Sequence, residues 1–186
     1  MLRALVRSAS ASAFLLLAEG LAAQSAPRVV VVPQVGTAVR NSFDMEQASM
    51  ASLMAEWRPF RFLALTAEGT AALGDPKRHH CSGTASCFAP ATIRSGATAG
   101  VVIRPFQLGP VAPYAGASLG VARWEQAEWG GNAPLATLRA GVDVRIAGPF
   151  GVRADVARRT VWSEEIGDTP AYTDVVSLGT SFAVGR

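Results

Sequence analysis

The sequence predicts an all-β domain: an eight-stranded antiparallel up-and-down transmembrane β-barrel. Stretches of about ten residues with period-two alternation recur along the chain, and turn chemistry separates them. Hydrophobic residues make up 49% of the chain and charged residues only 17%, against a usual charged share of about 25%. Short and long connections also alternate from the first predicted strand to the last. Such an apolar chain must bury its surface in a core or in lipid.

The first 23 residues predict a signal peptide, and residues 24–186 then form the barrel domain. Arg3 and Arg7 precede an uncharged stretch, and small residues at Ala22 and Ala23 suit cleavage. A buried amphipathic helix is the alternative interpretation of this segment. Export would bring the chain to an oxidising compartment, where disulfides persist.

We expect strands at 29–37, 50–58, 60–73, 92–104, 111–122, 135–146, 150–161 and 173–185. Alternation is clearest in the last three, whose apolar faces comprise Leu138, Ala140, Val142, Val144 and Ile146, then Phe150, Val152, Ala154 and Val156, then Val176, Leu178, Thr180, Phe182 and Val184. Successive side chains point to opposite faces of a strand, so each strand has one apolar face and one polar or small-residue face.

The segment 44–57 also suits a helix, because it contains good helix formers. Its larger apolar residues recur at helical spacing, at Met50, Leu53, Met54 and Trp57. The same segment alternates in period two, with Leu53, Ala55 and Trp57 against Met54, Glu56 and Arg58. We predict a strand here.

The connections favour a membrane barrel over a soluble meander. Short turns at 57–60, 106–110 and 147–150 alternate with longer polar connections at 40–49, 74–91, 123–134 and 163–172. A barrel with short periplasmic turns, longer outer loops and both termini in the periplasm has this layout. A spanning helix needs about 20 apolar residues. The longest uncharged stretch, 105–122, has 18 residues and contains three prolines and three glycines.

The composition of the two faces predicts which one meets lipid. A soluble barrel points its apolar face inward, whereas a membrane barrel points it outward. Ala, Val and Leu dominate the apolar faces, while Gly, Ser and Ala are common on the opposite faces and suit a narrow interior. Lys77 is the only lysine, although exposed strands of soluble proteins usually carry several. We therefore expect the apolar faces outside.

In this layout of strands and connections, the chain after residue 26 resembles the small outer-membrane β-barrels of the OmpA/OmpX/OmpW type. The resemblance implies an outer-membrane location, contact with membrane lipid, and insertion by the outer-membrane assembly machinery. The alternating Leu178, Thr180, Phe182 and Val184 resembles the last strand of such barrels, whereas the final Arg186 departs from the aromatic residue with which they usually end. We expect a monomer. The absence of any run of basic residues argues against nucleic acid as a partner.

Outward apolar faces would direct several charged side chains into one narrow lumen. This predicted network comprises Glu56, Arg58, Glu68, Arg139, Asp143, Arg145, Arg153 and Asp155. Eight-stranded barrels have interiors that side chains just fill, and buried charges are costly unless they are paired. A tight turn around Gly148 would place Asp143 opposite Arg153, with Arg145 beside Asp143 and Asp155 diagonal to Arg139.

Two motifs suggest chemistry. Gly116–Gly120 matches G-x-S-x-G, but it falls inside a predicted strand with no helix after it, whereas a hydrolase nucleophile needs a strand-to-helix turn. Cys81 and Cys87 are six positions apart beside His79 and His80, and we expect a disulfide rather than a zinc site. The only histidines lie in this loop, away from the strands. We expect no enzyme activity, no cofactor and no metal site.

The sequence supports one function hypothesis and two alternatives. The first is an outer-membrane barrel with a structural or surface-interaction role in the cell envelope. The second is a conduit or binder for small apolar molecules, as the resemblance to the OmpW type would allow. The third is a soluble periplasmic β-barrel that carries a ligand.

Overall fold

The computed structural model describes residues 28–41, 48–73, 91–126, 129–163 and 170–184. The predicted signal peptide at 1–23, both cysteines (Cys81 and Cys87) and both histidines lie outside them. The cleavage and the disulfide therefore remain predictions.

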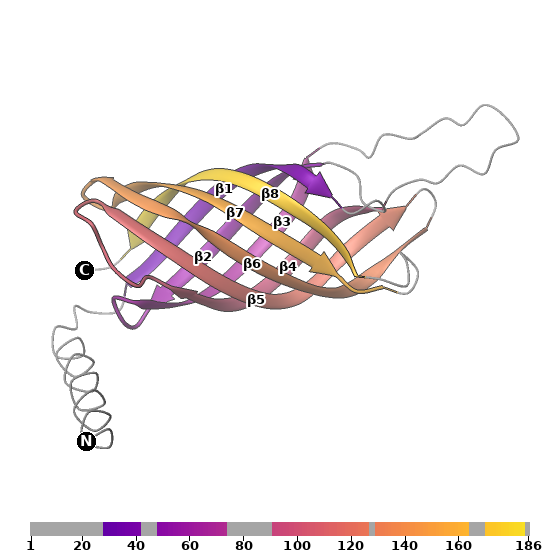
Figure 1. Ribbon diagram of the computed structural model, residues 1–186, viewed down its shortest axis with the longest axis horizontal. Helices are drawn as coiled ribbons and strands as arrows, with labels where there is room; N and C mark the ends of the chain where they lie inside the picture. Colours follow the sequence, from indigo (N-terminus) through magenta and orange to yellow (C-terminus); the bar gives the residue numbers. More distant parts are fainter. Residues whose placement is uncertain (1–27, 42–47, 74–90, 127–128, 164–169, 185–186) are drawn as a thin grey trace, which may run out of the picture.

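The described residues form a closed barrel of eight strands in the order of the sequence (Figure 1). The strands are β1 (Arg28–Asn41), β2 (Ser49–Arg58), β3 (Leu63–Leu73), β4 (Thr92–Ile103), β5 (Val111–Gln126), β6 (Trp129–Ala147), β7 (Phe150–Val161) and β8 (Ala171–Val184). Each strand pairs antiparallel with the next, and β8 pairs with β1 to complete the ring. This confirms the predicted up-and-down barrel, including the strand at 50–58. No helix in these ranges is long and apolar enough to cross a membrane.

The two ends of the barrel differ. At one end, which we call the turn end, the connections 59–62, 104–110 and 148–149 join β2 to β3, β4 to β5 and β6 to β7 (Figure 1). Val29 pairs with Val184 there, so the first and last described residues also lie at the turn end. Gly109 and Gly148 adopt positive φ values of 60° and 53° within these turns, a conformation that favours glycine. We call the opposite end the loop end.

One predicted connection is wrong. We expected a long polar loop at 123–134, but β5 continues to Gln126 and β6 begins at Trp129, with register pairs from Arg123↔Asn132 to Gln126↔Trp129. The glycines and polar residues of this segment resemble loop composition. They lie in a hairpin that continues beyond the apolar part of the barrel, where outward side chains need not be apolar.

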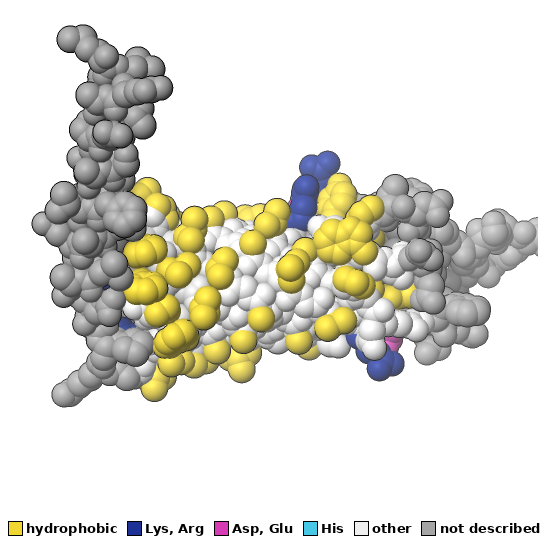
Figure 2. All heavy atoms as spheres, turned by 90° about the horizontal axis from the view of Figure 1, so that it is seen from below, with side chains coloured by type: hydrophobic (Ala, Val, Ile, Leu, Met, Phe, Trp, Pro, Cys, Tyr) yellow, Lys and Arg dark blue, Asp and Glu magenta, His cyan; other side chains and the backbone are white. Residues whose placement is uncertain are grey.

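Large apolar side chains project from the outside of the barrel, and Figure 2 shows hydrophobic side chains spread over one of its faces. Leu119 and Leu138, near the middle of β5 and β6, are 71% and 61% exposed, whereas the inward Glu56 and Arg153 are fully buried. This distribution is the reverse of a soluble protein, in which charged residues are almost never fully buried. It argues against the soluble barrel, because a soluble barrel would fill its interior with these leucines.

Candidate functional site: the barrel interior

The interior is filled with side chains that form layers along the barrel axis. An apolar cluster lies toward the loop end and includes Met50, Ile93, Trp124, Leu135, Val161 and Val175. Trp124, which we expected in a loop, lies in this cluster and is only 1% exposed. Smaller apolar groups lie toward the turn end, around Val32 and around Val102. Charged and uncharged polar side chains occupy the rest of the interior.

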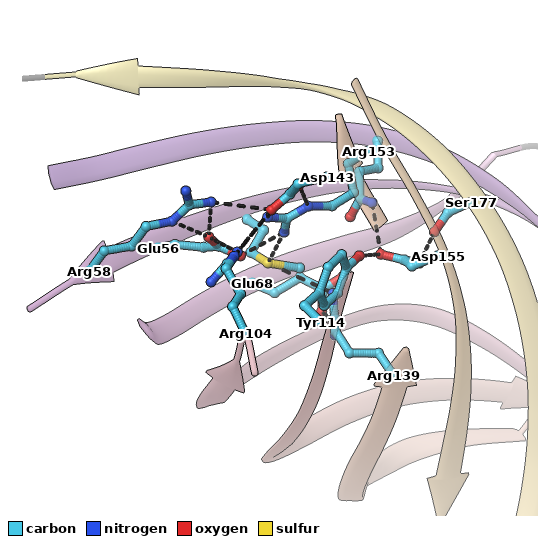
Figure 3. Close-up of polar contacts among 12 residues, drawn as sticks. Glu56, Arg58, Glu68, Arg104, Tyr114, Arg139, Asp143, Arg153, Asp155 and Ser177 are labelled. Atoms are coloured by element: carbon cyan, nitrogen blue, oxygen red, sulfur yellow. Dashed lines mark hydrogen bonds and ion pairs between the residues drawn. The ribbon is translucent and has the colours of Figure 1, made fainter. Parts of the chain in front are cut away.

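Two carboxylates and three guanidinium groups form one compact cluster, which we call the acid–arginine cluster (Figure 3). It contains Glu56, Arg58, Arg104, Asp143 and Arg153. Glu56 lies 2.7 Å from both Arg58 and Arg104, and 2.6 Å from Arg153. Asp143 accepts two hydrogen bonds from Arg153, at 2.6 and 2.8 Å, and contacts Arg104 at 3.0 Å. Each carboxylate therefore bridges all three arginines.

The strand register explains part of this cluster. Asp143 on β6 pairs directly with Arg153 on β7, and the two form a bidentate ion pair. Glu56 comes from β2, which is not a neighbour of β6 or β7 in the sheet. Its contact with Arg153 crosses the lumen. The cluster thus links distant parts of the ring through the interior.

Two uncharged side chains support Arg153. The Tyr114 ring lies 4.7 Å from the Arg153 guanidinium carbon, a cation–π distance. The Met54 sulfur accepts a hydrogen bond from Arg153 Nη1 at 3.3 Å. The guanidinium is therefore surrounded on several sides, and Arg153 is fully buried.

The remaining buried charges form two smaller groups. Arg139 donates a hydrogen bond to Glu68, and Arg159 also lies 3.2 Å from Glu68. Asp155 instead accepts hydrogen bonds from Gln34 at 2.9 Å, from Tyr114 at 2.7 Å and from Ser177. No ion pair joins Asp155 to an arginine within the described ranges, so neutral donors satisfy this carboxylate.

The predicted lumen residues therefore lie in separate groups rather than in one network. Glu56, Arg58, Asp143 and Arg153 lie together, and Glu68 with Arg139 forms a separate pair. Asp155 occupies the expected diagonal position to Arg139, since Gly141 is its register partner, but Arg139 bonds Glu68 instead. Arg145 is exposed and has no ion pair with any described residue.

Sequence reasoning missed several interior residues. They are Gln34, Met54, Arg104, Tyr114, Arg159 and Ser177. Arg159 could have been found, because it continues the alternating face of Arg153 and Asp155. Arg104 directly follows β4, at the end of the predicted strand 92–104, and its partners come from the distant strands β2 and β6.

The G-x-S-x-G motif lies within β5, as expected. Ser118 is buried on the interior face of that strand, and no helix follows it. Among the described residues, no group of three or more His, Cys, Asp and Glu side chains could hold a metal ion.

Comparison with protein-family models and with curated protein sequences finds no match. Solved structures do match. Neisserial surface protein A (NspA) is 14% identical, with 85% of this chain and 97% of that chain covered and a TM-score of 0.59. The N-terminal β-barrel domain of Pseudomonas aeruginosa OprF is 11% identical, with 86% and 100% covered and a TM-score of 0.56. The attachment invasion locus protein Ail of Yersinia pestis is 12% identical, with 87% and 100% covered and a TM-score of 0.51. The chain therefore has the fold of the small eight-stranded outer-membrane β-barrels.

Proposed function

We propose that this protein is a monomeric outer-membrane β-barrel with a structural or surface-interaction role in the cell envelope, and that its lumen does not conduct. The observation that carries this proposal is the packed interior. The fully buried Glu56 and Arg153 form an ion pair across the lumen, and the apolar cluster around Trp124 fills the barrel on the loop-end side of this pair. A conducting pore needs a continuous aqueous path, which this packing interrupts.

The exterior supports a position in a membrane. Exposed aromatic residues lie near the turn end, where Phe150 and Phe182 pack with ring centroids 5.0 Å apart. Aromatic side chains are common at both membrane interfaces. Toward the loop end, the apolar surface gives way to charged pairs, and Figure 2 shows protruding basic side chains there. Arg158 and Asp174 form one such pair, at 2.7 Å. These two borders delimit an apolar belt that lipid tails would cover.

The predicted signal peptide and the fold favour the outer membrane as the location, with its lipids and the outer-membrane assembly machinery as partners. Barrels cross membranes because closure leaves no unpaired backbone edge in lipid. The alternative role as a conduit for small apolar molecules requires a path through the wall or the lumen. The filled interior argues against the lumen path. The proposal includes no catalytic activity.

The proposal is tested in three measurements on the full chain. We expect the protein in the outer-membrane fraction. We also expect its gel mobility to change on heating, because a folded barrel resists unfolding by the detergent at low temperature. We also expect no unitary conductance in planar bilayers. The variant Arg153→Ala removes the central cation of the acid–arginine cluster. It is compared with the wild type in the conductance measurement. Recovery of wild-type protein as a detergent-free soluble monomer, or steady wild-type conductance, would contradict the proposal.

A further inference from the structure

Arginines concentrate on the interior face of the barrel at the turn end. Arg28 on β1 and Arg58 on β2 are register partners, so they lie on the same face of the sheet. That face is the interior, since Val30 and Glu56 beside them are buried. Arg145 lies two residues beyond the interior Asp143 on β6, and its register partner Gly151 is buried. We call Arg28, Arg58 and Arg145 the turn-end rim.

The charge of this region is unbalanced. The rim together with Arg104 and Arg153 contributes five positive charges, and Glu56 and Asp143 contribute two negative charges, so the net charge is +3. Both carboxylates already contact Arg58, Arg104 and Arg153. The exposed Arg28 and Arg145 have no ion pair within the described ranges. Like charges directly opposite on neighbouring strands are destabilising, so the Arg28–Arg58 pair needs an explanation.

A buried hydrogen-bond donor on Arg104 is the second observation at this end of the barrel. Arg104 is only 7% exposed, yet its Nη1 atom has no hydrogen-bond partner among the described residues, although its Nε and Nη2 atoms bond Asp143 and Glu56. Figure 3 shows the side chains of Arg58 and Arg104 on the turn-end side of the acid–arginine cluster. Buried charged donors are normally satisfied. An anion that enters from the turn end would satisfy this one.

We propose that the turn-end rim and Arg104 bind a soluble phosphate-bearing anion. The guanidinium fork matches the spacing of phosphate oxygens and donates two parallel hydrogen bonds. A cation would be repelled by the net charge, and an apolar molecule would leave the Arg104 donor unsatisfied. The rim residues lie on the interior face of their strands rather than on the face that carries the apolar belt, which favours a soluble phosphate over the headgroup of a neighbouring lipid. Arg28 and Arg145 would contact the anion first because they are exposed.

The experiment measures calorimetric binding of inorganic pyrophosphate to the full folded chain in a non-ionic detergent at low salt. Arg28→Gln and Arg145→Gln should each weaken binding by about tenfold, as expected for the loss of one charge-assisted contact. Both residues are exposed and unpaired within the described ranges, so the variants should keep the heat-dependent gel mobility of the folded barrel. Arg123→Gln removes an equal charge from the outer surface, where its side chain is 66% exposed, and should leave binding unchanged.

A second arm distinguishes the source of the phosphate. The same titration in phosphatidylcholine vesicles is repeated with phosphatidylglycerol added. Unchanged affinity supports a soluble ligand, whereas competition by the anionic lipid would overturn that assignment. Absence of saturable binding, or equal weakening in Arg123→Gln, would overturn the site itself. Either failure would leave the membrane-barrel proposal untouched, because that proposal depends on the closed interior and the apolar belt.

Discussion

Replacement of Asp143 by alanine should destabilise the barrel far more than replacement of its neighbour Val144. Asp143 bonds the fully buried Arg153 at 2.6 and 2.8 Å and also contacts Arg104 and Arg58. Its loss leaves three guanidinium groups with Glu56 alone. Removal of one partner from a buried ion pair costs about 3–5 kcal/mol. Because Glu56 remains and the Asp143 side chain is 12% exposed, we expect a value near the lower end, about 3 kcal/mol.

Val144→Ala removes two methyl carbons from the outward face of β6, where Val144 is half-buried. Lipid tails can fill the space, so the cost should stay at about 1 kcal/mol. A matched third variant, Asp143→Asn, keeps the shape of the side chain and removes only the charge. The loss of stability in Asp143→Asn should lie between the losses in the other two variants, because the amide can still accept a hydrogen bond from Arg153.

The assay is equilibrium unfolding by urea in lipid vesicles, followed by tryptophan fluorescence and by gel mobility. The free energy of unfolding is compared among the wild type and the three variants. If Val144→Ala costs as much as Asp143→Ala, the ion pairs of the interior do not stabilise the barrel more than an outward apolar side chain does. A further comparison, Asp143→Ala with Arg153→Ala in one chain, should cost less than the sum of the single changes, since the pair acts as a unit.

Four further predictions concern other parts of the chain. Leu119→Arg places a charge in the middle of the apolar belt and should cost about 2–4 kcal/mol in the same unfolding assay, whereas a solvated surface would tolerate it. Gly148→Ala should cost about 1–2 kcal/mol, because the φ of 53° disfavours a β-carbon; an unchanged stability would mean that the turn relaxes. Mass spectrometry of the exported protein should find the chain beginning near Gln24, and an intact Met1 would exclude a signal peptide. Thiol titration of the unreduced, denatured protein should find neither Cys81 nor Cys87 free, and two reactive thiols would exclude the disulfide.

The strands could be predicted because each one alternates between two environments. Leu138 and Val142 project outward and Arg139 and Asp143 inward, and a period-two pattern reports this directly. The long hairpin of β5 and β6 was harder to predict. Beyond the belt, both faces of a strand tolerate polar residues and glycine, so the alternation disappears although the backbone ladder continues to Gln126 and Trp129.

Some of the interior contacts could likewise be predicted from the sequence, and others could not. The pairing of Asp143 with Arg153 follows from one tight turn, so local reasoning reaches it. The contact of Glu56 with Arg153 depends on how the ring closes and how far the strands are offset, which no single hairpin determines. Arg104 was missed for the same reason, because its partners come from β2 and β6.

The pairing of β1 with β8 constrains the order of events during membrane insertion. This seam joins the residues farthest apart along the described chain, for example Val29 with Val184, whereas every other pairing is a local hairpin. Until β8 is available, the backbone groups along the free edges of β1 and β7 have no partner within the chain, and hydrocarbon offers none. Complete synthesis must therefore precede stable insertion, and a chain that ends before Ala171 should remain a substrate for proteolysis rather than become a smaller barrel.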